Sequence, residues 1–140
     1  PEGRFELLVL HAALMMRSLR HDGQRGRETA QALFDQMFKD LDRNLREMGV
    51  ADLVVPKRIR KMGEAFYGRA GVYDAGLDAD DDTALADALA RNIFDGRAGA
   101  ERLDAMVRYV RECDATLAAT GLEIIEAGEP GWPAAPGVAA

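Results

Sequence analysis

The strongest constraint on this chain is a stripe of apolar residues with helical spacing between residues 28 and 48. The stripe falls within about 100° on a helical wheel, the width expected of a helix that packs against a core. Its members are Ala30, Phe34, Met37, Phe38, Leu41, Leu45 and Met48. Gly49 follows at once and can end the helix, because glycine adopts the left-handed conformation without a steric penalty. The sequence therefore predicts a long amphipathic helix over residues 28–48.

Helical spacing recurs at about residues 4–19, 56–67, 83–95 and 101–119, and no segment alternates convincingly like a strand. The segment from Arg20 to Gly23 is expected to end the first helix, with Gly26 as a further breaker, and Gly68 to end the third. Pro56 fits a first helical turn, where its missing N–H costs no bond.

Residues 73–82 predict a turn-rich linker, with an aspartate among residues 80–82 capping the fourth helix. A short connector predicts that the second and third helices form a hairpin. The predicted fold class is all-α: a single domain of about five helices packed as an irregular bundle. This domain should span residues 1–127, followed by a flexible Gly/Pro/Ala tail over residues 128–140.

Composition agrees with one globular core. Apolar residues make up 48% of the 140 residues. The longest apolar run, Leu7 to Met16, contains His11 and is shorter than the ~20 residues that a membrane-spanning helix needs. The first residue is Pro1 rather than Met, so we expect a fragment or a processed chain.

Charge is distributed unevenly along the chain. Residues 1–72 hold 13 basic and 10 acidic side chains, a net charge of +3, whereas residues 73–140 hold 5 and 14, a net charge of −9. Such polarity can orient a partner. Alternatively, the two halves attract each other inside the fold, and both interpretations stay open at this point.

Side chains that carry enzyme chemistry are scarce. His11 is expected to be a satisfied, partly buried residue, His21 to be solvated, and Cys113, the only cysteine, to be a packing residue. The Asp-rich segment of residues 78–82 resembles the opening of a calcium-binding loop. Thr83, however, occupies the position that requires Gly, and Leu89 the position that requires Glu. The sequence predicts no enzyme, no catalytic residue, no metal ligand and no cofactor.

The densest basic cluster consists of Lys57, Arg58, Arg60 and Lys61, which surround the apolar stripe of the predicted third helix. The plainest interpretation is a solvated helix face, and the alternative is a docking surface. Nucleic-acid binding fits poorly, because the chain is acidic overall and lacks an aromatic platform on which bases could stack.

A family resemblance is carried by residues 38–69. Its pieces, in order, are Asp42-Arg-Asn-Leu-Arg-Glu-Met-Gly49, Asp52-Leu53, Lys61-Met62 and Ala65-Phe-Tyr-Gly-Arg69. Together they resemble the signature stretch of the ubiquinol–cytochrome c chaperone family, and a weaker resemblance extends over most of residues 5–120.

The resemblance implies a non-catalytic assembly chaperone for the cytochrome bc1 complex. Its client would be cytochrome b or another bc1 subunit, and a second assembly factor is a further implied partner. Alanine, arginine and aspartate richness is typical of a bacterial protein, so we expect a cytoplasmic location with peripheral contact to the inner membrane. The alternative function is a helical adaptor that binds folded protein or an anionic membrane surface through its basic helix.

Two groups of residues are predicted to make functional or structural contacts. The partner-binding group lies on the predicted third helix: Lys57, Arg58, Lys61, Tyr67 and Arg69. The second group is a polar network of Asp42 and Asn44 at the margins of the second helix's stripe. In this network Asp42 is predicted to pair with Arg58 or Arg69.

Overall fold

The computed structural model describes residues 2–122, 125, 128, 131–134 and 136, and all regular structure in this part of the chain is helical. The helices are α1 (Glu2–Arg20), α2 (Gly23–Glu47), α3 (Val55–Asp78), α4 (Thr83–Asn92) and α5 (Ala100–Ala119). The predicted all-α fold is confirmed. No helix of the described residues is long and apolar enough to cross a membrane.

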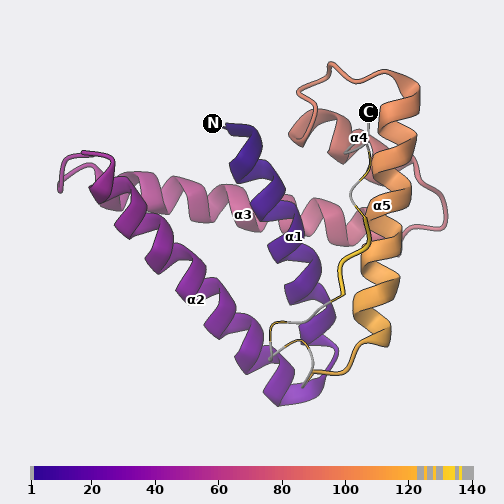
Figure 1. The fold of residues 1–140 in the computed structure, drawn as a ribbon, viewed down its shortest axis with the longest axis horizontal. Coiled ribbons are helices and arrows are strands. Elements are labelled where there is room, and N and C mark those ends of the chain that lie inside the picture. The colour runs from indigo at the N-terminus through magenta and orange to yellow at the C-terminus, as the bar shows by residue number, and fades with distance from the viewer. Residues whose placement is uncertain (1, 123–124, 126–127, 129–130, 135, 137–140) are drawn as a thin grey trace.

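The helices are arranged around α1. Figure 1 shows α2 and α3 diverging from their connector as the two arms of a V, with α1 crossing between them. α1 packs on α2, α3 and α5, and α4 joins α3 to α5. The predicted α2–α3 hairpin is confirmed as a pair of neighbours in contact, but its arms splay apart because α1 occupies the space between them.

The core is centred on α1. Val9, Leu10, Leu14 and Leu19 are each at most 1% exposed, and they pack with apolar side chains of the other four helices. The hydrophobic effect of burying such side chains is what holds the splayed arms in place. The apolar run that starts at Leu7 is thus a core helix, although Leu7 itself is 41% exposed.

Helix α3 continues eleven residues beyond the end of the predicted segment 56–67, since it runs through Gly68 to Asp78. The predicted linker over residues 73–82 is therefore wrong except at its end. Each helical glycine costs about 1 kcal/mol relative to Ala, but Tyr73 and Leu77 are buried on this stretch and offset that cost. Gly76 is required by close packing, because a Cβ there would lie 2.9 Å from the Leu85 Cα.

The corner between α1 and α2 is tighter than predicted. α2 begins at Gly23, so Gly26 lies inside the helix rather than between helices. A Cβ on Gly26 would lie 2.0 Å from the Leu19 carbonyl oxygen, which explains why glycine occupies this position. At the other end α2 stops at Glu47, and Met48, predicted as the last member of the core stripe, lies outside the helix and is 78% exposed.

The start of α4 and the C-terminal segment complete the fold. α4 begins at Thr83, as predicted, and its Thr83 N–H donates to the Asp81 carboxylate at 2.9 Å. In the segment predicted to be a flexible tail, residues 129–130, 135 and 137–140 lie outside the described residues. Trp132 is described, and its ring meets His11 edge-on at 5.0 Å. The boundary of the domain at residue 127 stays a prediction.

Candidate functional site

Aromatic rings gather where the inner faces of α2 and α3 approach each other. Phe34 and Phe38 of α2 face Phe66 and Tyr67 of α3, with the Phe34 centroid 5.4 Å from Phe66 and 5.2 Å from Tyr67. Phe66 is buried, whereas Tyr67 is 62% exposed. Tyr67 therefore presents a large amphipathic side chain that is anchored at one edge and open at the other.

Tyr67 and Phe34 line an apolar groove of about 240 Å³ between the arms of the V. Its other lining residues come from all three helices around it: Ala13, Met16, Arg20, Arg27, Ala30, Gln31, Phe66 and Ala70. The floor is apolar and the two arginines lie on the rim. Such a groove suits an apolar side chain whose neighbours carry carboxylate or carbonyl groups.

A shallower depression of about 550 Å³ borders Tyr67 on the outer side of α3. α3 contributes Gly68, Gly71, Val72 and Ala75 to it, and α4 contributes Ala84, Asp87 and Arg91. Because the side chains here are small, another helix could approach the α3 backbone closely. Tyr67 thus stands between two concave apolar surfaces.

The five predicted partner-binding residues do not form one surface. Tyr67 opens on the groove, but Arg69 turns to α1, where its Nε donates to the Glu6 carboxylate at 2.6 Å. This bond raises the pKa of Arg69. Lys57, Arg58 and Lys61 are exposed in the first two turns of α3, and the described part of the chain shows no ion pair for them.

The predicted pairing of Asp42 with Arg58 or Arg69 is wrong. Asp42 accepts a hydrogen bond from Arg46 Nε at 2.7 Å, one helical turn away, and Arg46 Nη1 also donates to Asp52 at 3.0 Å. A local i,i+4 partner is reached at little entropic cost, so it wins over a partner on another helix. The side chain of Asn44 is exposed.

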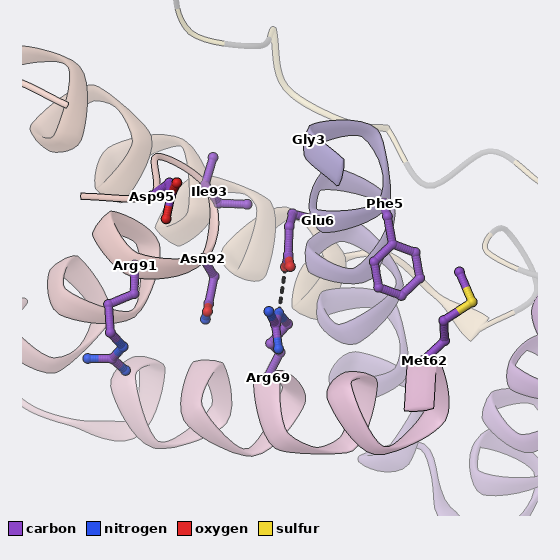
Figure 2. Close-up of a pocket in the computed structure, with 9 residues that line it drawn as sticks. All are labelled: Gly3, Phe5, Glu6, Met62, Arg69, Arg91, Asn92, Ile93 and Asp95. Atoms are coloured by element: carbon purple, nitrogen blue, oxygen red, sulfur yellow. Dashed lines mark hydrogen bonds and ion pairs between the residues drawn. The ribbon is translucent and has the colours of Figure 1, made fainter. Parts of the chain in front are cut away.

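A polar cavity of about 640 Å³ lies at the opposite end of α1 from the α1–α2 corner (Figure 2). The Glu6–Arg69 pair crosses it, with Phe5 and Met62 on one side and the end of α4 on the other. Figure 2 shows the side chain of Arg91 directed away from this pair. Glu6 and Arg69 already neutralise each other at its centre, which makes it a poor candidate for a strongly charged ligand.

Arg17 joins three helices, a role that the sequence analysis missed. Its guanidinium donates to Asp114 of α5 at 3.0 Å and to Asp78 of α3 at 2.8 Å, and it also reaches Asp74. Burial alone would lower the pKa of Arg17, but the hydrogen bonds to Asp78 and Asp114 outweigh it and raise the pKa. The signal in the sequence was an arginine directly after the apolar run of α1.

The Arg17 cluster also bears on the charge asymmetry of the chain. Arg17 and Arg20 belong to the basic half, while Asp74, Asp78 and Asp114 belong to the acidic half. Attraction between the halves inside the fold is therefore real. It accounts for part of the asymmetry and leaves the basic residues at the start of α3 outside these pairs.

His11 and Cys113 have structural roles in the α1–α5 interface, as predicted. His11 Nδ1 donates to the Leu7 carbonyl at 2.8 Å, and the Tyr109 hydroxyl donates to His11 Nε2 at 2.6 Å. Burial raises the pKa of the Cys113 thiol, which makes it a poor nucleophile. Within the described residues, no group of three or more His, Cys, Asp or Glu side chains could hold a metal ion.

Comparison with known proteins gives consistent results. Residues 1–132 match the protein family described as "Ubiquinol-cytochrome C chaperone". The ubiquinol-cytochrome-c reductase complex assembly factor 1 of Xenopus laevis is 28% identical over 130 residues, which are 91% of this chain and 64% of that protein. The mitochondrial protein CBP3 of Saccharomyces cerevisiae is 32% identical over 111 residues, 76% of this chain and 33% of that protein.

A solved structure is also similar. The crystal structure of the Cbp3 homolog from Brucella abortus superposes with a TM-score of 0.83 and 38% identity, covering 99% of this chain and 76% of that one. The curated relatives are longer proteins, since this chain spans less than two thirds of their own lengths.

Proposed function

Because this chain belongs to the ubiquinol–cytochrome c chaperone family, we propose that it is a non-catalytic assembly chaperone for the cytochrome bc1 complex. We propose further that its client is a hydrophobic subunit of that complex, such as newly made cytochrome b. The names of the relatives support assembly of ubiquinol–cytochrome c reductase as the process. The observation that carries the proposal is the apolar groove between α2 and α3, with Tyr67 at its edge.

The groove fits a segment of an unassembled membrane protein. Such a segment offers apolar side chains, and recognition of an amphipathic or apolar helix in a hydrophobic groove is a recurrent mode of binding. A volume of about 240 Å³ holds one or two side chains rather than a whole helix. Binding would therefore rest on a few anchoring side chains, as is usual at protein interfaces.

The rim adds a preference for the end of a client segment. Arg27 stands on the α2 side of the groove, whereas Arg20 on the α1 side is already paired with Asp74 at 2.7 Å. Cationic side chains stabilise the C-terminal end of a helix, where carbonyl groups are unpaired. A client segment that presents this end, or an acidic residue, would match the rim.

Among the predicted partner-binding residues, Tyr67 is the proposed client contact. Arg69 would act through its bond to Glu6, which fixes α1 against α3. The three basic residues at the start of α3 belong to a different surface. This division replaces the single surface expected from the sequence.

The test is Tyr67→Asp, because this side chain is exposed and its loss should not unfold the domain. We expect the amount of client that co-purifies to fall by about 30-fold, the equivalent of one interface hot spot, and bc1 to accumulate poorly. Leu7→Asp is the matched control, since Leu7 is also exposed and lies outside the groove.

Tyr67→Phe separates shape from polarity and should retain function. Circular dichroism and thermal melts of each variant confirm folding. Normal bc1 levels and normal co-purification of the client with folded Tyr67→Asp would exclude the groove as the client site. An unchanged bc1 level in a strain that lacks the whole protein would exclude the assembly function itself.

A further inference from the structure

The connector between α2 and α3 exposes apolar side chains at the point of the V. Leu53 is 90% exposed and Met48 is 78% exposed, and Val54 beside them is also exposed. Figure 1 shows this end of the hairpin projecting away from α4 and α5. We name residues 46–61 the hairpin tip. We propose that the hairpin tip inserts into the headgroup region of an anionic lipid bilayer, an inference that goes beyond client binding.

The local geometry holds these side chains outward. Val55 is fully buried, and the Val54 N–H donates to the Ala51 carbonyl at 2.8 Å. Asp52 is fixed to α2 by its 3.0 Å bond from Arg46. Leu53 is therefore presented by a folded turn. Its exposed side chain leaves apolar surface in contact with water, and a bilayer could cover that surface.

Charge at the hairpin tip is opposite to that of the rest of the molecule. The tip contains five cationic and two acidic side chains, a net charge of +3, so the remainder of the −6 chain carries −9. One of the two carboxylates, that of Asp52, is already paired with Arg46. The cations without a recorded partner in the described residues are Lys57, Arg58, Arg60 and Lys61.

The spacing of apolar and cationic residues matches the depth of a membrane interface. At 1.5 Å per residue, Lys57 and Lys61 lie about 3 and 9 Å along α3 from Val55. Apolar side chains of interfacial proteins enter about 5–10 Å into the boundary between headgroups and acyl chains. With Leu53 at that depth, the lysines reach the lipid phosphates.

A bilayer fits the hairpin tip better than a second protein would. Basic residues stand on several sides of α3 rather than on one face: on the helical wheel, Lys57 points opposite to Phe66, with Arg58 and Arg60 on either flank. A ring of cations around an apolar point suits a laterally uniform anionic surface. Electrostatic repulsion would keep the remainder of the chain, with its net charge of −9, away from the same anionic surface and so orient the molecule.

Co-sedimentation of the purified full chain with vesicles tests the proposal without any client. We expect binding to vesicles of phosphatidylcholine and phosphatidylglycerol, loss of binding as salt is raised, and little binding to phosphatidylcholine alone. Lys57→Gln with Lys61→Gln should weaken binding roughly thirtyfold, because each cation near an anionic surface contributes about fivefold. Arg97→Gln with Arg108→Gln is the control of equal charge change and should bind normally, since both residues lie outside the tip.

The apolar part of the hairpin tip has its own variant. Leu53→Ser should weaken binding about tenfold, the equivalent of roughly half the burial of a leucine side chain. Leu7→Ser is the matched control for an exposed leucine elsewhere. Thermal melts should be unchanged for all four variants.

Three results would overturn the inference. These are no binding of the wild-type chain to anionic vesicles, equal binding to neutral and anionic vesicles, and normal binding of folded tip variants. If the tip variants lost the client in detergent extracts while the wild-type chain ignored vesicles, the tip would be a protein contact instead. Normal vesicle binding by Tyr67→Asp, together with loss of client, would show that the two surfaces are separate.

Discussion

Tyr73 provides a sensitive test of the core, because its hydroxyl is buried without a recorded hydrogen bond. The residue is 1% exposed, and its hydroxyl lies near the Asn92 side chain without a bond of standard geometry within the described residues. Burying an unpaired hydroxyl costs about 1–3 kcal/mol. Tyr73→Phe removes this cost and keeps the ring, so we expect it to stabilise the protein by about 1 kcal/mol at neutral pH.

The same substitution should change the response to alkaline pH. Burial raises the pKa of Tyr73 to about 12 from an ordinary value of 10.0, since it disfavours the phenolate. Between these values the folded state binds more protons than the unfolded state, so stability is complete below pH 10 and falls as pH rises toward 12. The loss from Tyr73 is about 2.7 kcal/mol for a shift of two pKa units. Tyr73→Phe should lack this part, while burial of Tyr109, which raises its pKa as well, still contributes.

Urea denaturation at neutral pH and at a series of alkaline values measures both effects. Tyr109→Phe is the matched control, because the Tyr109 hydroxyl donates to His11 at 2.6 Å. Its loss should destabilise the protein by about 1 kcal/mol at neutral pH, the opposite sign to Tyr73→Phe. If Tyr73→Phe lowered stability at pH 7, the hydroxyl would have a hydrogen-bond partner in solution. If the substitution left the loss of stability at alkaline pH unchanged, Tyr73 would not be the source of that loss. Either result would refute the argument.

The remaining predictions concern packing and charge. Gly76→Ala should destabilise the protein by about 1–3 kcal/mol in a thermal melt, because the new Cβ meets the α4 backbone. Gly68→Ala, with open space around it, should instead stabilise the protein by up to about 1 kcal/mol. Equal effects of the two substitutions would reject the close approach of α4 to Gly76. Arg17→Met should lower the free energy of unfolding by about 2 kcal/mol at neutral pH, because it leaves the carboxylates of the Arg17 cluster unpaired. The loss should shrink in acid as these carboxylates become protonated. A loss that does not change with pH would argue against the ion pairs. Leu41→Ala should cost about 1–2 kcal/mol rather than the 2–5 kcal/mol of a fully buried leucine, because Leu41 is only partly buried; a larger loss in urea titration would place it in the core.

Helices with a strong apolar period could be predicted from the sequence, and those stabilised by distant contacts could not. The stripe from Ala30 to Leu45 identifies α2 because burial and helical period agree there. The second half of α3 was missed because Gly68 looks like a helix end and residues 73–82 look like a linker. The role of Gly76 depends on α4, whose backbone approaches it and whose position no local pattern encodes.

The candidate site was predictable in its composition rather than in its geometry. Tyr67 could be singled out, because its place on the helical wheel puts it off the centre of the stripe. That Phe34 joins it in a groove depends on the splay of α2 and α3, which follows from the packing of α1. Arg69 was assigned to a partner because its position on α3 does not reveal that Glu6 of α1 lies opposite.

The central position of α1 has a consequence for the order in which the chain folds. Its partners on α5 lie at the far end of the sequence, because Asp114 follows Arg17 by 97 positions and Leu117 follows Ser18 by 99. Contacts of such separation form late, because the entropy of closing a long loop is lost before the contacts compensate for it. The α1–α2 and α2–α3 pairs join helices that are neighbours in the sequence, so they can form before α5 docks against α1. During that interval the apolar side of α1 that α5 will cover is open to water, and the newly made chain is itself prone to aggregate.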